Sequence, residues 1–278
     1  MNSFIHVPQY VRISFVLVSI FLLLINIAGI FLHPSFDTVD SIQKRGTPGY
    51  QHPVSDKVLL LTMLKVKGDT GNTSFVDSAT RKVFYSMFHT DERRIAIYEN
   101  WIMWLAGKMY RPAGRTQDAA LLVKGGAGNC SERTQVLMDI FKLNGLNFRI
   151  IALNGHVAEQ VLFNGQWMVT DPDYGLVYKG DMQQMATEQG LMYADSVLAA
   201  NGFDKTMREK YLYFWKTGND NILSPLNKMS STRLYKAERI SQWLRWIIPT
   251  LILFTCIIPW KRKKYNKATV KTICFEDT

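Results

Sequence analysis

Cysteine is scarce in this chain, with three residues among 278, at positions 130, 256 and 274. Cys256 lies in an apolar segment and Cys274 lies near the end of the chain, so Cys130 stands alone between residues 33 and 242. We therefore expect no intramolecular disulfide in that region. A single thiol also excludes a zinc site built from cysteines, because such sites need three or four ligands. The sequence predicts neither a metal nor another cofactor.

Nucleic-acid signals are also lacking, although the net charge of +10 at first suggests them. Residues 33–242 hold 25 basic and 21 acidic residues and are only +4, whereas the two ends hold 8 basic and 2 acidic residues. No stripe of basic and aromatic residues follows any segment, and we find no repeat or low-complexity tract. The glycine-rich stretch at 125–129 lacks the Gly-Lys-Ser/Thr ending of a phosphate-binding loop. We expect no nucleic-acid partner.

Two segments lack charge over a length that suits a lipid bilayer. Ile13–Leu32 is 20 residues without a charge, about 30 Å as a helix. A cleaved signal peptide is the alternative, but its apolar region would be shorter and no small-x-small cleavage site follows. The second segment, Trp246–Trp260, holds 15 uncharged residues. It spans a bilayer if it starts at Ile240 and the Arg245 side chain reaches the interface.

The basic residues that follow the second segment predict its orientation. Lys261–Lys264 is a run of basic residues, which favours a cytoplasmic C-terminus by the positive-inside rule. Two spans place both termini on the cytoplasmic side, so residues 33–242 face outward. Basic residues on the other side, such as Lys44 and Lys236, oppose this assignment. The lipid bilayer is thus an expected partner of a two-pass protein with a periplasmic or extracellular domain.

The expected organisation has five parts. Residues 1–35 form an N-terminal tail and transmembrane helix, and residues 36–75 form a linker rich in glycine and proline. Residues 76–225 form the main domain, with its core at 120–180. Residues 240–260 form the second transmembrane helix, and 261–278 a basic cytoplasmic tail. Within the domain we expect helices at 76–88, at 91–109 with Asp91 as N-cap, at 181–200 and at 203–217.

Cys130 is placed by its local sequence at the start of a helix. Residues 125–129 predict a loop, and residues 131–143 carry apolar side chains at helical spacing. Asn144-Gly145 supplies the residues that end helices. At the N-terminus of this helix, unpaired N–H groups and the helix dipole favour a thiolate over a thiol.

His156 and Asp171 are brought together by a predicted hairpin. Asn164-Gly165 lies between two strand-like segments, which is a strong signal for a two-residue type I′ turn. The turn pairs Phe163 with Gln166, and the same register places Asp171 diagonally across from His156, with Cβ atoms about 7 Å apart. The sequence therefore predicts a thiolate that faces a His–Asp pair on a sheet.

This block resembles the transglutaminase-like superfamily, whose papain-like core carries a Cys–His–Asp triad in the same chain order. The matching elements are Gly128-x-Cys130 before a helix, Gly155-His156, and Trp167-x-x-x-Asp171-Pro172. The resemblance covers about a quarter of the chain and suggests a membrane-anchored, bacterial-type member. It implies an α+β fold in which the Cys-bearing helix packs on an antiparallel sheet with extra helices. One transmembrane helix would flank this fold at each end.

The resemblance implies acyl transfer through a Cys130 thioester, with His156 as acid and base and Asp171 orienting the imidazole. The backbone N–H of Cys130 would be one oxyanion donor; candidates for a second are Trp101, Trp104, Gln117 and Asn129. The expected substrate is a peptide, protein or amide of the cell envelope. Hydrolysis is favoured over transamidation because water is abundant. The alternatives are a catalytically silent binding or scaffold module and an acyl or amino-acyl transferase acting on an envelope glycan.

Overall fold

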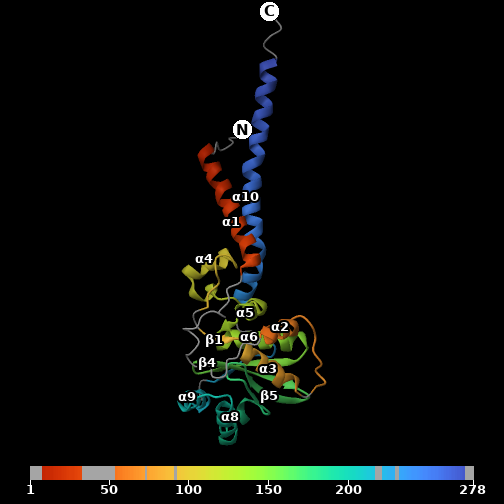
Figure 1. The fold of residues 1–278 in the computed structure, drawn as a ribbon, viewed down its shortest axis with the longest axis vertical. Helices are drawn as coiled ribbons and strands as arrows, with labels where there is room; N and C mark the ends of the chain where they lie inside the picture. Colours follow the sequence, from red (N-terminus) through yellow and green to blue (C-terminus); the bar gives the residue numbers. More distant parts are fainter. Residues whose placement is uncertain are drawn as a thin grey trace, which may run out of the picture. The chain divides into compact units, whose positions relative to one another are not determined.

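The chain forms two compact units, which are described separately. The helical unit comprises Met1–His33, Ile95–Gly114 and Lys236–Thr278, and the α+β unit comprises Pro34–Arg94 and Arg115–Tyr235. Figure 1 labels most of the helices and some of the strands. The computed structural model describes residues 8–32, 54–72, 74–90, 93–216, 221–228 and 232–272.

Two long helices dominate the helical unit. Helix α1 spans Gln9–Phe31 and α10 spans Thr232–Thr272. They lie side by side, and the Asn26 side chain donates a hydrogen bond to the Arg245 carbonyl at 2.7 Å (Figure 1). Between them in sequence lie α4, Trp101–Met109, and the 3-10 turn η2, Arg111–Gly114.

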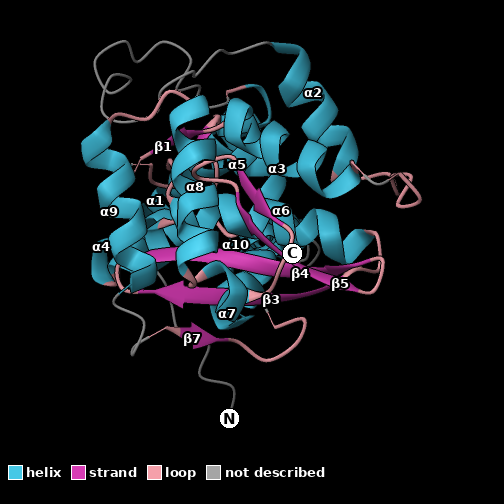
Figure 2. Ribbon diagram, turned by 90° about the horizontal axis from the view of Figure 1, so that it is seen from below, coloured by secondary structure: helices cyan, strands magenta, loops and turns pink. Residues whose placement is uncertain are grey.

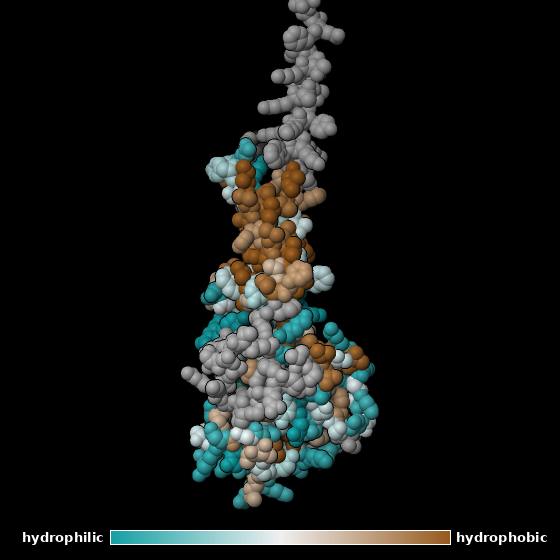
Figure 3. Space-filling view, viewed as in Figure 1, coloured by the Kyte–Doolittle hydropathy of each residue, from teal (hydrophilic) through white to brown (hydrophobic). Residues whose placement is uncertain are grey.

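Both long helices are long and apolar enough to cross a membrane, over Gln9–Phe31 and Arg233–Ile257. Their exposed side chains are largely apolar, which gives the continuous hydrophobic surface of Figure 3. The expected span Ile13–Leu32 lies on α1 up to Phe31, and the expected span 240–260 lies on α10. Helix α10 extends beyond the expected span on both sides and continues through Pro249.

An antiparallel sheet of five strands organises the α+β unit, with the order β6-β5-β4-β3-β7. The central hairpin has the predicted register, from Phe163↔Gln166 to Glu159↔Thr170. Asn164 and Gly165 both have positive φ, 49° and 78°, as a type I′ turn requires. The strand bounds are β3 Asn147–Leu153, β4 His156–Phe163, β5 Gln166–Asp171, β6 Leu176–Tyr178 and β7 Ile222–Leu223.

Helices cover both faces of this sheet, as Figures 1 and 2 show. Because strand side chains alternate, residues such as Val161 and Phe163 face one apolar core, and Ala158 and Val169 face the other. The first core is covered by α2 Val54–Met63, α3 Phe75–Ser86, α5 Ala119–Gly125 and α6 Cys130–Leu143. The second is covered by α7 Met182–Met185, α8 Glu188–Ala200 and α9 Lys205–Lys216. The domain is thus α+β, as expected.

Helix α6 is closed at both ends by side-chain and backbone caps. The Asn129 side chain accepts the Glu132 N–H, and the Glu132 carboxyl accepts the Asn129 N–H, which is a complete capping box. At the other end, Leu146 N–H bonds to the Phe141 carbonyl, and Gly145 takes φ +72°. This is the Schellman arrangement that the Asn144-Gly145 pair predicts. The helix that carries Cys130 is therefore defined by local sequence.

Several expected elements differ in the structure. The helix expected at 91–109 begins only at Trp101, because the Asn100 side chain caps it by accepting the Met103 N–H. Asp91, its expected N-cap, lies outside the described residues. The helix expected at 181–200 is divided at Thr187, whose side chain caps α8. Residues 36–75, expected as a linker, contain α2, and residues 127–128 form the short strand β2.

Candidate functional site

The structure brings Cys130, His156 and Asp171 together in the α+β unit. Cys130 is the first residue of α6, His156 the first of β4 and Asp171 the last of β5. The His156 Nε2 atom lies 2.7 Å from Asp171 Oδ2. The Cys130 side chain is also close enough to His156 to raise the pKa of the imidazole through a side-chain hydrogen bond. The predicted diagonal contact across the hairpin is therefore present.

A second contact fixes the start of α6 against the start of β4. The Thr134 hydroxyl, one turn after Cys130, donates to the carbonyl of Val157 at 3.3 Å. Val157 follows His156 directly in the strand. The contact therefore holds the helix turn that carries the thiol beside the residue that carries the imidazole.

Burial increases from the thiol to the carboxylate. Cys130 is half-buried, His156 is 5% exposed and Asp171 is fully buried. A nucleophile must reach its substrate, whereas the group that orients a base works best away from water. The order of exposure is that of a nucleophile, a base and an orienting carboxylate.

Electrostatics favour the protonated imidazole. Burial by itself lowers the pKa of His156, but the charge and hydrogen bond of Asp171 outweigh it, and a side-chain hydrogen bond with Cys130 raises it further. The pKa of His156 is thus raised well above its usual value. A histidine held beside a thiol is the pairing from which cysteine nucleophiles are built.

Asp171 is in turn positioned by the turn that follows it. Its second oxygen, Oδ1, accepts the backbone N–H of Asp173 at 3.0 Å. Gly175 ends the turn with φ +64°, and a Cβ there would come within 2.9 Å of the Phe84 ring. The residues that sequence alone assigns to an ordinary turn therefore also hold the carboxylate in place.

A buried ion pair lies directly behind this turn. Arg133, which is fully buried, donates to Asp173 Oδ1 at 2.8 Å and to the Phe84 carbonyl at 2.8 Å. Burial by itself raises the pKa of Asp173, but the Arg133 charge and a hydrogen bond from His89 hold it far below the usual range. Arg133 lies one turn after Cys130 on α6, so it ties the thiol-bearing helix to the Asp171 loop.

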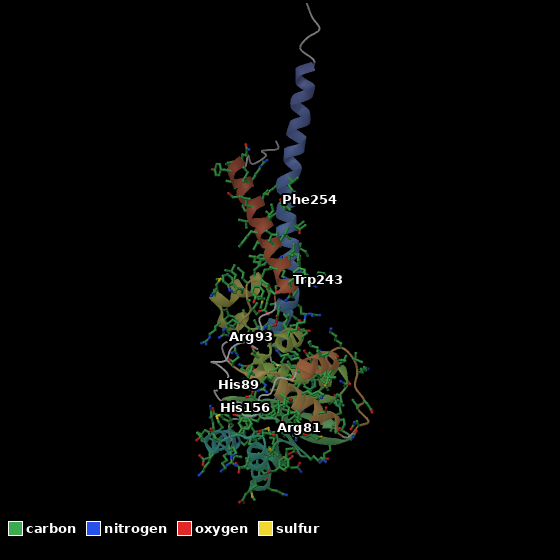
Figure 4. The ribbon with its side chains drawn as sticks, viewed as in Figure 1. Arg81, His89, Arg93, His156, Trp243 and Phe254 are labelled. Atoms are coloured by element: carbon green, nitrogen blue, oxygen red, sulfur yellow. The ribbon has the colours of Figure 1, made fainter. Side chains whose placement is uncertain are left out.

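His89 forms a second His–Asp pair beside the first. Its Nδ1 atom lies 2.8 Å from Asp173, and its side chain is 38% exposed. Strand β1, Phe88–His89, pairs in parallel with β2, Ala127–Gly128, so His89 lies opposite Gly128, two residues before Cys130. Sequence reasoning missed both His89 and Arg133, because their partner lies 84 and 40 residues away in the chain. Figure 4 labels His89 and His156 in the same region.

An aromatic wall surrounds the His156 imidazole on the side of α9. The Phe214 ring stacks on it, with centroids 5.4 Å apart and an interplanar angle of 15°. Tyr174 meets the imidazole edge-on at 5.3 Å, and Tyr211 lies 6.0 Å away. The sequence leaves the role of the α9 aromatic residues open. The structure places Tyr211 and Phe214 in the core against the imidazole and leaves Tyr213 exposed.

Glu159 is a further buried acid near the triad. It is fully buried on β4, and one oxygen accepts the Thr170 hydroxyl at 2.9 Å. Burial raises the pKa of Glu159 well above its usual value, and the charge on nearby Asp171 raises it further. The carboxyl is therefore held in its neutral form more readily than an exposed glutamate.

The candidates for a second oxyanion donor lie in different parts of the structure. Trp101 and Trp104 belong to the helical unit, on α4, and not to the α+β unit that holds the triad. The Asn129 side-chain oxygen is used to cap α6. The Cys130 N–H lies in the first turn of α6, where N–H groups have no intrahelical acceptor.

Within the residues that the structure describes, no group of three or more His, Cys, Asp or Glu side chains could hold a metal ion. A surface hollow of about 300 Å³ lies on α3, away from the triad. Its lining consists of exposed or half-exposed polar residues and holds an ordinary Arg81–Asp77 helix pair, of which Figure 4 labels Arg81. We therefore regard the triad as the chemically specific feature.

Comparison of the chain with protein-family models, with curated proteins and with solved structures gave no match. The functional interpretation therefore depends on the geometry of the site.

Proposed function

We propose that the chain is a membrane-anchored cysteine enzyme of the transglutaminase-like type, acting on peptide or carboxamide bonds. The observation that carries the proposal is the linked series Cys130–His156–Asp171, with 2.7 Å between the imidazole and the carboxylate. The helix-borne thiol beside an antiparallel hairpin supports a papain-like core, because that core is built from the same two elements. The raised pKa of His156 supports an activated thiol.

The chemistry that follows is acyl transfer in two halves. Cys130 Sγ attacks the carbonyl carbon, and His156 carries the thiol proton. The C–N bond breaks, the departing amine takes the proton from His156, and a thioester remains on Cys130. The Cys130 N–H stabilises the oxyanion of the tetrahedral intermediate. Asp171 holds the imidazole tautomer and balances its positive charge.

The second half removes the acyl group. Water attacks the thioester, gives a proton to His156, and the S–C bond breaks to release a carboxylic acid and the thiol. An amine in place of water would give a new amide. Water is present at high concentration at an exposed membrane-bound site, so we assign hydrolysis as the main reaction and transamidation as the secondary one.

The proposed location is the outer face of a membrane. Two helices of sufficient length and hydropathy support two spans, and the basic residues after the second support a cytoplasmic C-terminus. The α+β unit would then act on peptides, proteins or amides of the cell envelope.

Acylation by an active ester tests the function without knowledge of the substrate. Full-length protein in detergent micelles is mixed with p-nitrophenyl acetate, and nitrophenol release is followed together with intact mass. We expect a burst and an acetyl group on Cys130, lost in Cys130→Ser and strongly slowed in His156→Ala. Equal acylation of wild-type protein and His156→Ala would contradict the proposal and favour a silent binding module on the same fold.

A further inference from the structure

Helix α4 is almost entirely apolar although it lies at the protein surface. Its sequence, WIMWLAGKM, contains one charged residue, Lys108. Leu105 is 53% exposed and Met109 is 88% exposed. A helix that faces water normally carries a polar face, and a helix without one is buried or lies in lipid. The outer face of α4 therefore requires an apolar covering.

The inner face of α4 is already packed within the helical unit. Met103 is 4% exposed, and Gly107 lies so close to η2 that a Cβ would come within 2.4 Å of the Gly114 Cα. Leu105 and Met109 are four residues apart and thus share one side of the helix, turned away from Met103. More than half of the Leu105 side chain and most of the Met109 side chain are therefore left uncovered on this side.

Hydrogen bonds fix the level of α4 along the two long helices. The side chain of Asn100, the N-cap of α4, donates to the Ser241 hydroxyl of α10 at 2.7 Å. The Arg245 side chain donates to the carbonyl of Glu99, the residue before this cap. The Arg245 carbonyl also receives the Asn26 side chain of α1. The start of α4 is therefore level with residues 241–245 of α10.

This level is where the outer end of the membrane spans is expected. Trp243, labelled in Figure 4, is 74% exposed, as suits a residue of an interfacial aromatic belt. Between Trp243 and Trp260 the only charged residue is Arg245. A single charge at the start of an apolar segment also places this level at the boundary between lipid and water. Lys108 lies over the Trp104 ring at 5.1 Å, a pairing that lets the ammonium reach headgroup phosphates while the stem stays on apolar surface.

We propose that α4 is an interfacial helix that lies in the bilayer surface beside the two spans, with Leu105 and Met109 in the lipid. The occupant of its outer face is phospholipid at the boundary between headgroups and acyl chains. The inference depends on the membrane placement proposed above and goes beyond it, because two spans alone do not require a third contact. It gives the helical unit a surface anchor as well as a transmembrane one.

Spin-label accessibility tests the proposal in the full chain. Leu105→Cys and Met109→Cys are made separately in a Cys130→Ser, Cys256→Ser, Cys274→Ser background and labelled with a nitroxide. The proteins are reconstituted in vesicles of phosphatidylcholine and phosphatidylglycerol. Matched controls are Phe254→Cys on α10, expected in lipid, and Met192→Cys on α8, expected in water; both positions are exposed, at 63% and 68%.

The expected result is a severalfold higher ratio of collisions with oxygen to collisions with a water-soluble nickel chelate at 105 and 109 than at 192. Values at 105 and 109 equal to that at 192 would overturn the proposal. Labels shielded from both reagents would also overturn it, in favour of a protein occupant such as a second copy of the chain. A water-exposed label at 254 would instead show that the membrane placement itself fails.

Discussion

At the scale of single residues, the Arg133–Asp173 pair is the strongest structural constraint behind the triad. Both side chains are nearly fully buried, and their charges are 2.8 Å apart. A buried pair is costly to break, because removal of one partner leaves a desolvated charge. Since Asp173 also donates its N–H to Asp171, the pair links the stability of the unit to the position of the triad carboxylate.

Asp173→Asn is therefore expected to lower the free energy of unfolding by about 3–5 kcal/mol, because Arg133 stays buried without its counter-charge. The matched control is Asp77→Asn, which removes the partner of Arg81 in an exposed pair on α3. That pair is expected to contribute about 0.3–0.5 kcal/mol. Thermal unfolding followed by near-UV circular dichroism compares the two. Equal, small shifts in Tm would contradict the assigned role of the buried pair.

The buried Glu159 carboxyl makes the free energy of unfolding depend on pH. Burial, with a contribution from Asp171, raises its pKa in the folded state, so the folded state holds this proton more tightly than the unfolded state does. A group of this kind removes stability as pH rises above the unfolded pKa of about 4.3. Glu159→Gln keeps the shape of the neutral acid but cannot ionise, so the stability of this variant does not fall as pH rises through this range.

We expect Glu159→Gln to match the wild type near pH 4 and to exceed it at pH 8 by about 1–3 kcal/mol, the cost of an imperfectly compensated buried group. Glu209→Gln, at a residue 65% exposed on α9, is the control and should follow the wild type throughout. Unfolding is measured at a series of pH values. A variant that is less stable than the wild type at pH 8 would show that the ionised carboxylate is required.

At the scale of elements, the capping box of α6 connects sequence to the site. Asn129 caps the helix whose first residue is Cys130, so its side chain fixes both the helix end and the approach of the thiol to His156. Helix α7 begins with a similar box, formed by Asp181 and Gln184 on the same α+β unit. The two boxes allow the effect of a cap on stability to be separated from its effect on the thiol.

Asn129→Ala and Asp181→Ala are each expected to cost about 1 kcal/mol of stability, since each removes an N-cap. Only Asn129→Ala should also slow alkylation of Cys130, because it loosens the turn that holds the thiol. The rates are measured with iodoacetamide at one pH below neutrality, on protein carrying Cys256→Ser and Cys274→Ser. An equal loss of rate in both variants would mean that general destabilisation, and not the local cap, controls the thiol.

The elements also show why part of the site was predictable from sequence. The hairpin is determined by Asn164-Gly165, which lies between the two strands it joins, so its register follows from local turn chemistry. The ends of α6 likewise follow from Asn129 and Gly145. Contacts such as His89 with Asp173 join residues 84 apart, and no local pattern encodes them.

At the scale of the whole molecule, the main difference from expectation is the segment Ile95–Gly114. A continuous domain was expected over residues 76–225, but the structure groups this segment with α1 and α10. The grouping depends on contacts across long separations, such as Asn100 with Ser241, which are 141 residues apart. Hydropathy identifies the two long helices because a segment that crosses lipid must be apolar over its length. It does not identify which other segment packs against them.

The measurement that tests the central claim most directly is the pH dependence of Cys130 alkylation. Full-length protein with Cys256→Ser and Cys274→Ser is compared with the same protein carrying His156→Ala or Asp171→Asn. We expect fast alkylation that persists well below about pH 8, where an ordinary thiol is protonated and unreactive. Both substitutions should slow it, His156→Ala more strongly, because they remove the imidazolium and its orienting carboxylate. An alkylation profile of an ordinary thiol, unchanged by either substitution, would contradict the assignment of Cys130, His156 and Asp171 as a catalytic unit.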